Sequence, residues 1–185
     1  MNVLEAIQGR RAVRAYEPRR VEKEVVERLL RAAVHAPSAM NAQPWLFAVI
    51  QDKARLARLS DRAKAMLLES ADPKTRHYGP MLREPSFNVF YDAGTLVAIG
   101  AAARGTYTDA DCWLAAEALM LAAYDAGLGT CPIGFAVPVL NAPDVKRELG
   151  FPDTGVVVAP IIVGYPAATP AEVPRGEPRV VSWST

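Results

Sequence analysis

Three arginines lie within five residues near the start of the chain, in the stretch GRRAVRAY at residues 9–16. Arg10, Arg11 and Arg14 carry planar guanidinium groups, which make paired, charge-assisted hydrogen bonds to phosphates and to planar electron-rich groups. A basic turn that is simply solvated has the same composition. The residues alone therefore leave two interpretations open, a solvated turn and a site for an anionic ligand.

A second candidate is the loop HAPSAMNAQPWLF at residues 35–47. Pro, Ser and Asn are ordinary loop residues, but Trp45 is a large aromatic side chain to place at the end of a connector. The loop also carries the polar side chains of Ser38, Asn41 and Gln43. We interpret it as a loop that holds a flat group.

The stretch GLGTCPIG at residues 127–134 is rich in glycine, like a nucleotide-binding loop. A dinucleotide-binding fingerprint follows a strand and opens a helix, whereas this stretch follows a predicted helix. Its glycines are better interpreted as a helix end that leaves backbone N–H groups exposed near a ligand. A plain helix end without a ligand remains the alternative.

Cys131, with His35 or His77 as a base, has the residue types of a nucleophilic site. The small apolar neighbours of Cys131 favour an inert buried thiol instead. We expect no metal site, because the two histidines are far apart in the sequence and no acidic pair has metal-ligand spacing. The GxSxG motif of serine hydrolases is absent from the sequence. The candidate residues that remain are arginines, backbone amides, amide side chains and aromatic rings. Groups of these types bind a cofactor.

Length and composition limit the classes of protein. The chain has 185 residues, which is close to one domain, and 51% of them are hydrophobic. A formal charge of +1 argues against a nucleic-acid partner and favours a small ligand. The sequence shows neither a signal peptide nor a membrane span, so we expect a cytoplasmic protein with two reduced cysteines.

The helices and strands that must position these residues follow from the apolar spacing. We expect helices at residues 2–8, 21–36, 52–71, 112–126 and 141–150. Short apolar runs predict buried strands at residues 45–51, 93–101 and 155–166. Pro160 cannot donate to a strand ladder, which predicts that the last strand lies at an edge or carries a bulge there. This order of elements indicates one domain of α+β or α/β layers.

Individual polar residues are expected to cap the helices. Asn2 and Glu5 have the spacing of a capping box for the first helix. Asp109 or Asp111 is expected to cap the helix at residues 112–126, and Asn141 the helix that follows it.

The helix at residues 112–126 is apolar nearly all round, since Glu117 and Asp125 are its only charged residues. Such a helix must be buried on every side, which in a small protein predicts that a second subunit covers one face. Residues 167–185 contain three prolines and predict an arm that packs on something else, the other subunit being one candidate. Residues 72–88 are predicted to be an irregular loop, long enough to be functional.

Four stretches together resemble the FMN-dependent nitroreductase family, in the family's order along nearly the whole chain. They are RRAVRAY (10–16), APSAMNAQPW (36–45), AAEALMLAAYDAGLGTCPIG (115–134), and PIIVGYP (160–166) with VPRGEPRVVSW (173–183). The resemblance implies an α+β fold with an antiparallel sheet flanked by helices. It also implies one domain over residues 1–185, an intertwined homodimer whose arm at 167–185 packs on the partner, and one tightly but non-covalently bound FMN in each of two interface clefts.

Site residues are implied by the same resemblance. Arg10 and Arg175 correspond to contacts with the FMN phosphate, with Arg11 on the same segment as Arg10, and Arg14 corresponds to the basic residue beside N1 and O2 of the flavin. The loop would reach the partner's flavin, and backbone groups behind the central helix would face N5. The remaining expected cofactor contacts are Ala12, Pro37, Ser38, Ala39, Asn41, Gln43, Pro132, Ile133 and Gly134.

Two positions depart from the family pattern. Ala12 stands where serine is usual, which leaves only its backbone amide as a contact. Ala118 stands where the central helix often carries asparagine.

The activity implied is transfer of a hydride from NAD(P)H to flavin N5, followed by reduction of a nitroaromatic, quinone or similar small-molecule acceptor in a ping-pong mechanism. No side chain is expected to act as an acid or base; Arg14 and the Gly134 backbone support the flavin. Two alternative hypotheses remain. One is a specialised flavin reaction such as reductive dehalogenation or dehydrogenation, and the other is an FMN carrier or sensor without turnover. A substrate lid would distinguish the specialised reaction, with Arg76, His77, Tyr78 and Arg83 as its candidate residues.

Overall fold

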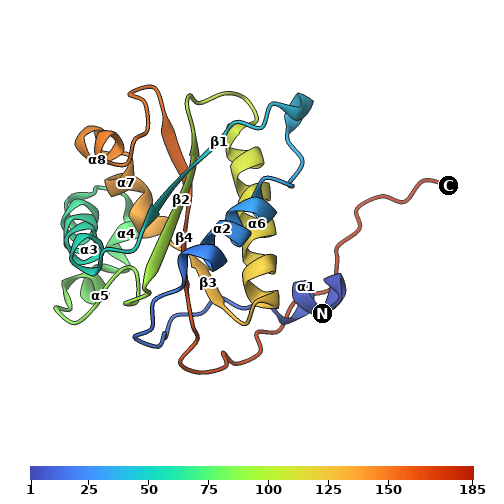
Figure 1. Ribbon diagram of the computed structural model, residues 1–185, viewed down its shortest axis with the longest axis horizontal. Coiled ribbons are helices and arrows are strands. Elements are labelled where there is room, and N and C mark those ends of the chain that lie inside the picture. Colours follow the sequence, from blue (N-terminus) through green and yellow to red (C-terminus); the bar gives the residue numbers. More distant parts are fainter.

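The computed structural model describes residues 1–185, apart from the side chain of residue 74. It is an α+β fold in which helices cover both faces of one antiparallel sheet (Figure 1). The strands are β1 (Trp45–Ile50), β2 (Thr95–Ala101), β3 (Gly129–Pro132) and β4 (Val156–Gly164). The helices are α1 (Val3–Gly9), α2 (Lys23–Ala33), α3 (Lys53–Glu69), α4 (Pro73–Arg76), α5 (Gly79–Arg83), α6 (Thr108–Asp125), α7 (Val137–Leu140) and α8 (Pro143–Glu148), with 3₁₀ turns η1 (Ala39–Asn41) and η2 (Gly134–Ala136).

The sheet has the strand order β1-β2-β4-β3, and every neighbouring pair is antiparallel. Of the two alternatives predicted from Pro160, an edge strand or a bulge, the edge strand is wrong, because β4 pairs on both sides. The Pro160 carbonyl accepts a hydrogen bond from Ile133 N at 2.9 Å, so the side of Pro160 that lacks a donor faces the end of β3. The predicted bulge is found in β4 itself: Ile99 pairs with Ala159 and the next residue, Gly100, pairs with Val157, which leaves Val158 as the extra residue, two positions before Pro160.

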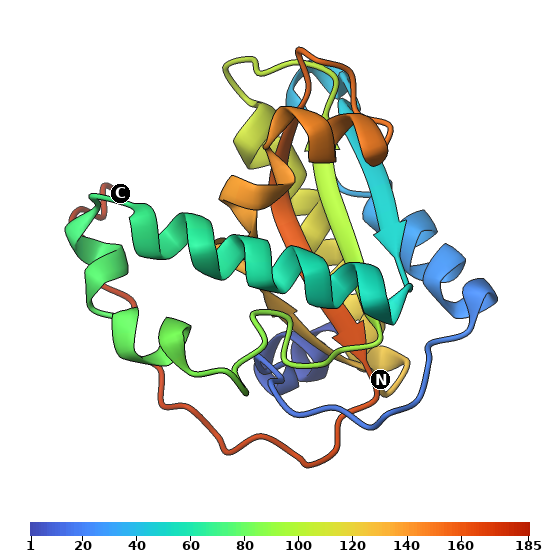
Figure 2. The same ribbon diagram turned by 90° about the vertical axis from the view of Figure 1, so that its left-hand side faces the viewer.

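Two cores pack against the two faces of the sheet. On one face, Val97, Ile99 and Ile161 pack with α2 and α6. On the other face, Ala98 and Ile162 pack with α3 and α7. Figure 2 shows α3 crossing this second face. Because both faces are covered, every residue of β2 and β4 is buried, which explains their continuous apolar sequence.

Helix α6 is only partly covered within one chain. It buries eight residues, but Trp113 and Leu114 are 42% and 45% exposed. These two residues lie with Glu117 and Leu121 on one stripe of the helix, by their helical spacing. The predicted burial is thus found on one side of α6, and its open side is the surface where a second subunit is expected.

The predicted capping box of α1 is confirmed: Asn2 Oδ1 accepts from Glu5 N at 2.9 Å, and Asn2 N donates to Glu5 Oε2 at 3.0 Å. The caps predicted for the later helices are wrong. Helix α6 begins at Thr108, so Asp109 and Asp111 lie inside its first turn.

Asn141 ends α7 instead of starting the next helix, α8, which begins at Pro143. Its side chain donates to Val137 O and Val157 O and accepts from Val157 N, and so ties α7 to β4. Its bond to Val137 O at the end of α7 and its two bonds to Val157 explain this asparagine, instead of a cap on α8.

Two other segments differ from the sequence-based expectation. Residues 72–88 are not wholly irregular, since they contain α4 and α5. The glycine-rich stretch at residues 127–134 contains β3, a fourth strand that was not predicted. Gly127 does end α6, with a positive φ of 73°.

Residues 167–185 leave the body of the protein as an extended arm (Figure 1). Val180, Val181 and Trp183 are exposed along it. Its packing on a partner subunit remains a prediction. Among the described residues, no helix combines the length and the hydropathy needed to cross a bilayer.

Candidate functional site

The arginine segment is fixed to the end of the sheet by backbone pairing. Ala12 forms an isolated parallel bridge with Thr130 of β3, and Val13 N donates to Thr130 O at 2.9 Å. Gly129 permits this approach, because a Cβ there would lie 2.6 Å from Val13 Cγ2. Tyr16 OH donates to Val13 O at 2.7 Å and holds the segment from its other end. The four residue steps from Arg10 to Arg14 span at most roughly 14 Å in an extended chain.

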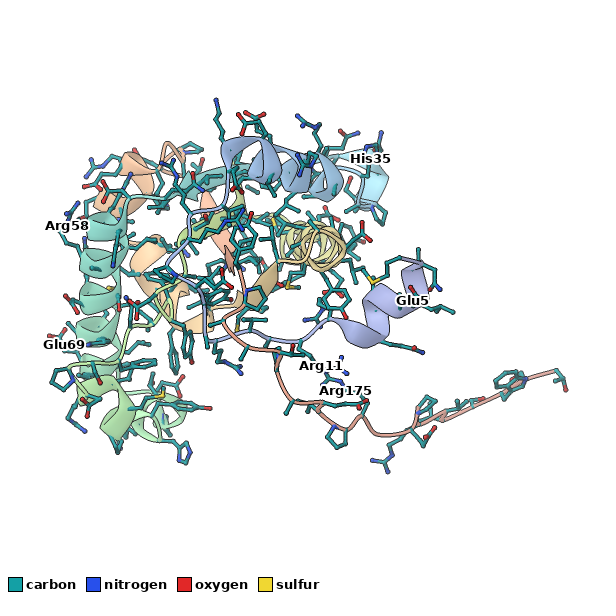
Figure 3. The ribbon with its side chains drawn as sticks, turned by 60° about the horizontal axis from the view of Figure 1, so that its bottom comes forward. Glu5, Arg11, His35, Arg58, Glu69 and Arg175 are labelled. Carbon is teal, nitrogen blue, oxygen red and sulfur yellow. The ribbon has the colours of Figure 1, made fainter. Side chains whose placement is uncertain are left out.

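Three arginines converge at the start of this segment, as the sequence predicted for Arg10, Arg11 and Arg175. They line one hollow together with two carboxylates, those of Glu117 and Glu172. Figure 3 shows Arg11 and Arg175 side by side, although they come from opposite ends of the sequence. The hollow carries one more cation than anions, which suits an anionic ligand.

Each of the two N-terminal arginines faces a carboxylate. Arg10 Nε lies 3.5 Å from Glu117 Oε1, and Arg11 Nη2 lies 3.7 Å from Glu172 Oε1. Neither distance corresponds to a tight hydrogen bond, and the buried Arg10 Nε lacks a hydrogen-bond partner among the described residues. A buried donor without a partner is costly, so this end of the site fits a ligand that brings acceptor oxygens.

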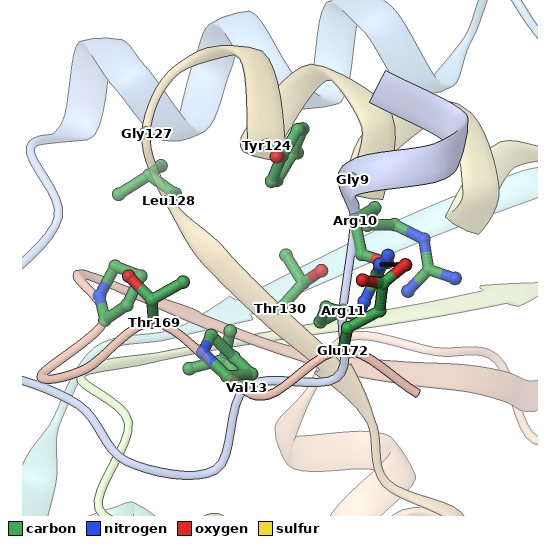
Figure 4. A pocket seen from close by; sticks show the side chains of 12 residues that line it. Gly9, Arg10, Arg11, Val13, Tyr124, Gly127, Leu128, Thr130, Thr169 and Glu172 are labelled. Carbon is green, nitrogen blue, oxygen red and sulfur yellow. Dashed lines mark hydrogen bonds and ion pairs between the residues drawn. The ribbon is translucent and has the colours of Figure 1, made fainter. Parts of the chain in front are cut away.

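Another hollow, of about 420 Å³, adjoins the arginines (Figure 4). It lies between residues 9–13, the end of α6 at Tyr124 and Gly127, and the arm at Thr169 and Glu172. This volume falls within the range of small-molecule pockets, about 300–1,000 Å³. The arm therefore forms one wall of the space beside the arginines.

Arg14 belongs to a second pocket, of about 320 Å³, at the far end of the segment. It meets there the three backbone positions that were predicted with it, Pro132, Ile133 and Gly134. A Cβ on Gly134 would meet nothing within 4 Å, so its backbone is open to a ligand. Gly134 also begins the 3₁₀ turn η2, where the first N–H groups have no partner within the turn.

Aromatic rings form the walls of this second pocket. The Arg14 guanidinium carbon lies 5.9 Å from the centre of the Tyr91 ring. Tyr78, from the turn between α4 and α5, meets Phe135 edge to face at 5.2 Å, and His77 meets Tyr78 at the same distance. Of the predicted lid residues, Tyr78 thus lines the pocket, and His77 contacts the ring of Tyr78. A flat ligand with an electron-rich edge near Arg14 fits these walls.

Cys131 lines the same pocket but is not an activated nucleophile. Burial raises the pKa of its thiol, and the nearby Arg14 opposes that shift only in part. Burial likewise raises the pKa of Tyr16, so both groups stay neutral at ordinary pH. This agrees with the sequence-based interpretation of Cys131 as an inert thiol.

The loop at residues 37–43 has a strained and well-tied backbone. Met40, Asn41 and Gln43 all have positive φ values, between 47° and 53°. A left-handed conformation at a non-glycine residue costs on the order of 1 kcal/mol or more and persists only where the surroundings enforce it. Ser38 Oγ accepts from Gln43 N at 2.9 Å, and Asn41 Oδ1 accepts from Gln43 Nε2 at 2.9 Å. The Ser38 hydroxyl therefore keeps its own hydrogen for another partner.

Within one chain, this loop does not join the arginines. Ala39 N donates to Asp111 in the first turn of α6, whereas Arg10 pairs with Glu117 and Gly9 lies against Tyr124 further along the same helix. The rise of 1.5 Å per residue places Glu117 roughly 9 Å beyond Asp111 along the axis, and Tyr124 roughly 20 Å beyond it. The resemblance assigned Pro37, Ser38 and Ala39 to the partner's cofactor, and their position at the opposite end of α6 is compatible with that.

Several residues at the site were not predicted from the sequence. The signal that could have identified Glu117 is its charge in an otherwise apolar helix. Tyr16, Tyr91 and Glu172 gave no local signal, because their roles depend on contacts distant in sequence. Asp111 was expected to cap a helix and instead holds the loop.

Comparisons with known proteins bear on the fold and the family of the chain. A protein of Archaeoglobus fulgidus with the provisional name NADH dehydrogenase/NAD(P)H nitroreductase is 30% identical over 88% of this chain and 84% of its own length. An iodotyrosine deiodinase of Thermotoga neapolitana is 27% identical, over 91% of this chain and 90% of its own. The crystal structure of a nitroreductase with bound FMN from Bacteroides fragilis superposes with a TM-score of 0.83 and 27% identity, over 100% of this chain and 99% of its own. The model of the Nitroreductase family matches residues 7–165, and the chain therefore belongs to the Nitroreductase family.

Proposed function

We propose that the protein is an FMN-dependent oxidoreductase that takes electrons from NAD(P)H and passes them to a small, flat, electron-poor acceptor. The observation that carries this proposal is the extended segment from Arg10 to Arg14. One end of that segment lies in a cationic hollow and the other in an aromatic pocket. A ligand with a phosphate at one end and a flat ring at the other matches both, and the relative from Bacteroides fragilis binds such a ligand.

When bound, FMN supplies two-electron redox chemistry at its ring. Arg10, Arg11 and Arg175 would hold the phosphate, and the buried Arg10 Nε would gain the acceptor it lacks. Arg14 would lie near the ring and stabilise negative charge that develops there on reduction. Ala12 would offer its backbone, and Pro132, Ile133 and Gly134 would face the ring edge.

Tyr78, Tyr91 and Phe135 would exclude water and align flat molecules in turn. One open pocket that takes donor and acceptor successively supports a ping-pong mechanism. Burial raises the pKa of the Cys131 thiol and of the Tyr16 phenol, so neither of these two groups is proposed as an acid–base catalyst. Nitroaromatics and quinones are the acceptors proposed, because they are flat and electron-poor.

The site is proposed to be completed by a second copy of the chain. Pro37, Ser38, Ala39, Asn41 and Gln43 would contact the partner's FMN, and the arm at 167–185 would pack on the partner. The open stripe of α6 at Trp113 and Leu114, together with the extended arm, supports this homodimer. Two free cysteines fit a reducing compartment, so we place the protein in the cytoplasm.

Reductive dehalogenation is the second candidate, favoured by the iodotyrosine deiodinase among the relatives. A substrate held by specific polar contacts would need a polar lid. The described lid contacts of His77 and Tyr78 are between rings, which supports the flat acceptor instead.

The test is to record the visible spectrum of the purified protein and then add NADH or NADPH without oxygen. A yellow protein bleached within seconds by either nicotinamide supports the proposal. Nitroaromatics, quinones and a halogenated tyrosine are then compared as acceptors, and turnover of the halogenated tyrosine alone would favour the second candidate. A yellow protein that neither nicotinamide bleaches would favour an FMN carrier or sensor. A colourless protein that takes up no added FMN would refute the proposal.

A further inference from the structure

Asp111 is a buried carboxylate that the proposed chemistry does not use. Its side chain lies in the first turn of α6, with 4% of the residue exposed, and Oδ1 accepts a hydrogen bond from Ala39 N at 3.0 Å. We propose that Asp111 is a positioning residue, which holds the loop at 37–43 in the shape and place where Ser38 contacts the FMN of the partner subunit. This inference rests on the proposed function.

Burying the carboxylate of Asp111 costs free energy unless the carboxylate makes hydrogen bonds such as the one from Ala39 N. A buried carboxylate requires a hydrogen-bonding partner, and the first turn of a helix stabilises negative charge. Asp109, two residues earlier, shows the ordinary alternative: it is exposed and pairs with Arg104 at 2.8 Å. The first turn thus has one surface carboxylate that serves an ion pair and one buried carboxylate that serves the loop.

The loop needs an external link because its own hydrogen bonds fix only its shape. The bonds from Gln43 to Ser38 and Asn41 lie within residues 38–43. Of the hydrogen bonds described for residues 38–43, the bond from Ala39 to Asp111 is the one that joins the loop to a core helix. Since Ala39 follows Ser38 directly, this bond sets where the Ser38 hydroxyl lies.

The first test compares FMN dissociation constants, measured by flavin fluorescence on protein freed of cofactor. Asp111→Ala should weaken FMN binding about tenfold or more, because it removes a hydrogen bond to a charged acceptor and frees the loop. Asp111→Asn keeps an acceptor oxygen and should restore affinity to within about twofold of wild type. Asp109→Ala is the matched control in the same turn and should bind FMN like wild type.

The second test asks whether Asp111 acts across the subunit boundary. Heterodimers are prepared with two affinity tags, pairing an Asp111→Ala chain with an Arg10→Ala, Arg175→Ala chain. If the loop serves the partner, the arginines of the first chain meet the intact loop of the second. One FMN should then bind per heterodimer with wild-type affinity. If Asp111 acts within its own chain, both sites are impaired and no such binding remains.

The outcomes separate this inference from the proposed function. Wild-type affinity in Asp111→Ala, failure of Asp111→Asn to restore binding, or a heterodimer without a wild-type site would each overturn the inference. A wild-type monomer that binds FMN would also overturn it, whereas a wild-type protein that binds no FMN overturns the proposed function itself. If Asp111→Ala does not fold, Ala39→Pro removes the donor from the loop side. It should weaken FMN binding similarly, and wild-type affinity in that variant would overturn the inference.

Discussion

Removing the Arg10 side chain tests the phosphate end of the site most directly. The side chain of Arg10 is 21% exposed, and its buried Nε has no hydrogen-bond partner among the described residues. A charge-assisted hydrogen bond from such a group contributes about 1.5–3 kcal/mol to binding. Glu117 competes for the same guanidinium, which places the expected loss at the lower end of this range. Arg10→Ala should therefore weaken FMN binding about tenfold, since 1.4 kcal/mol corresponds to a factor of ten.

The chain itself should tolerate this change. The carboxylate left behind belongs to Glu117, whose side chain is 46% exposed and can be hydrated. Loss of a partly exposed ion pair costs about 1 kcal/mol or less. The free energy of unfolding of Arg10→Ala, measured with urea in the absence of FMN, should thus stay close to that of wild type.

Comparing FMN with riboflavin isolates the phosphate contact. Fluorescence titrations of wild type and Arg10→Ala with both ligands form a cycle in which the flavin ring is constant. Arg10→Ala should weaken FMN binding and leave riboflavin binding unchanged. Arg58→Ala is the control, because Arg58 lies on α3 on the other side of the molecule (Figure 3). Equal losses for the two ligands would refute the assignment of Arg10 to the phosphate.

Three further predictions concern the segment and its supports. Tyr16→Phe removes the 2.7 Å bond to Val13 O and should lower the urea-measured unfolding free energy by about 1 kcal/mol; an unchanged value would contradict that support. Gly129→Ala brings a Cβ to 2.6 Å from Val13 Cγ2 and should cost about 1–3 kcal/mol in the same assay, whereas a neutral result would show that the segment can move away. The hydrogen bond from Tyr165 is the main cause that lowers the pKa of Glu22 to about 2. The folded-state pKa is thus below the unfolded value of 4.5, so the stabilisation exists above pH 4.5 and is lost as the pH falls toward 2. Unfolding free energies of wild type and Glu22→Gln should converge over that interval, and a constant difference would argue against the pKa shift.

Local signals predicted the elements whose stability is local. The capping box of Asn2 and Glu5 correctly marked the start of α1, and the apolar run from Trp45 correctly gave β1. The strand at Gly129–Pro132 was missed because it has four residues and includes a glycine and a proline. This strand forms because it pairs with β4 and bridges to Ala12, and both partners are distant from it in the sequence. Pro160 correctly indicated a bulge in β4, but the central place of β4 could not be predicted, because whether a proline is tolerated depends on which neighbour its missing donor faces.

The candidate site shows the same division. Its arginines and its glycine-rich turn could be named from residue type and from the family resemblance, and the structure gathers Arg10, Arg11 and Arg175 as expected. The carboxylate partners of these arginines could not be predicted from the sequence, because the pairing of Arg11 with Glu172 depends on the path of the arm. The role of Asp111 was assigned incorrectly, since a helix cap and a loop anchor have the same local sequence pattern.

The two halves of the proposed site also imply that cofactor binding and dimer formation are coupled. The loop is fixed near Asp111 and the arginines near Glu117 and Tyr124, so α6 separates them within one chain. Two chains related by a twofold axis would place each loop against the other's arginines while covering the open stripe at Trp113. A ligand that contacts both chains binds the dimer and not the separated chains, so it must strengthen their association by mass action. FMN should therefore lower the dimer dissociation constant, and Asp111→Ala should weaken that effect while leaving the association of cofactor-free chains unchanged.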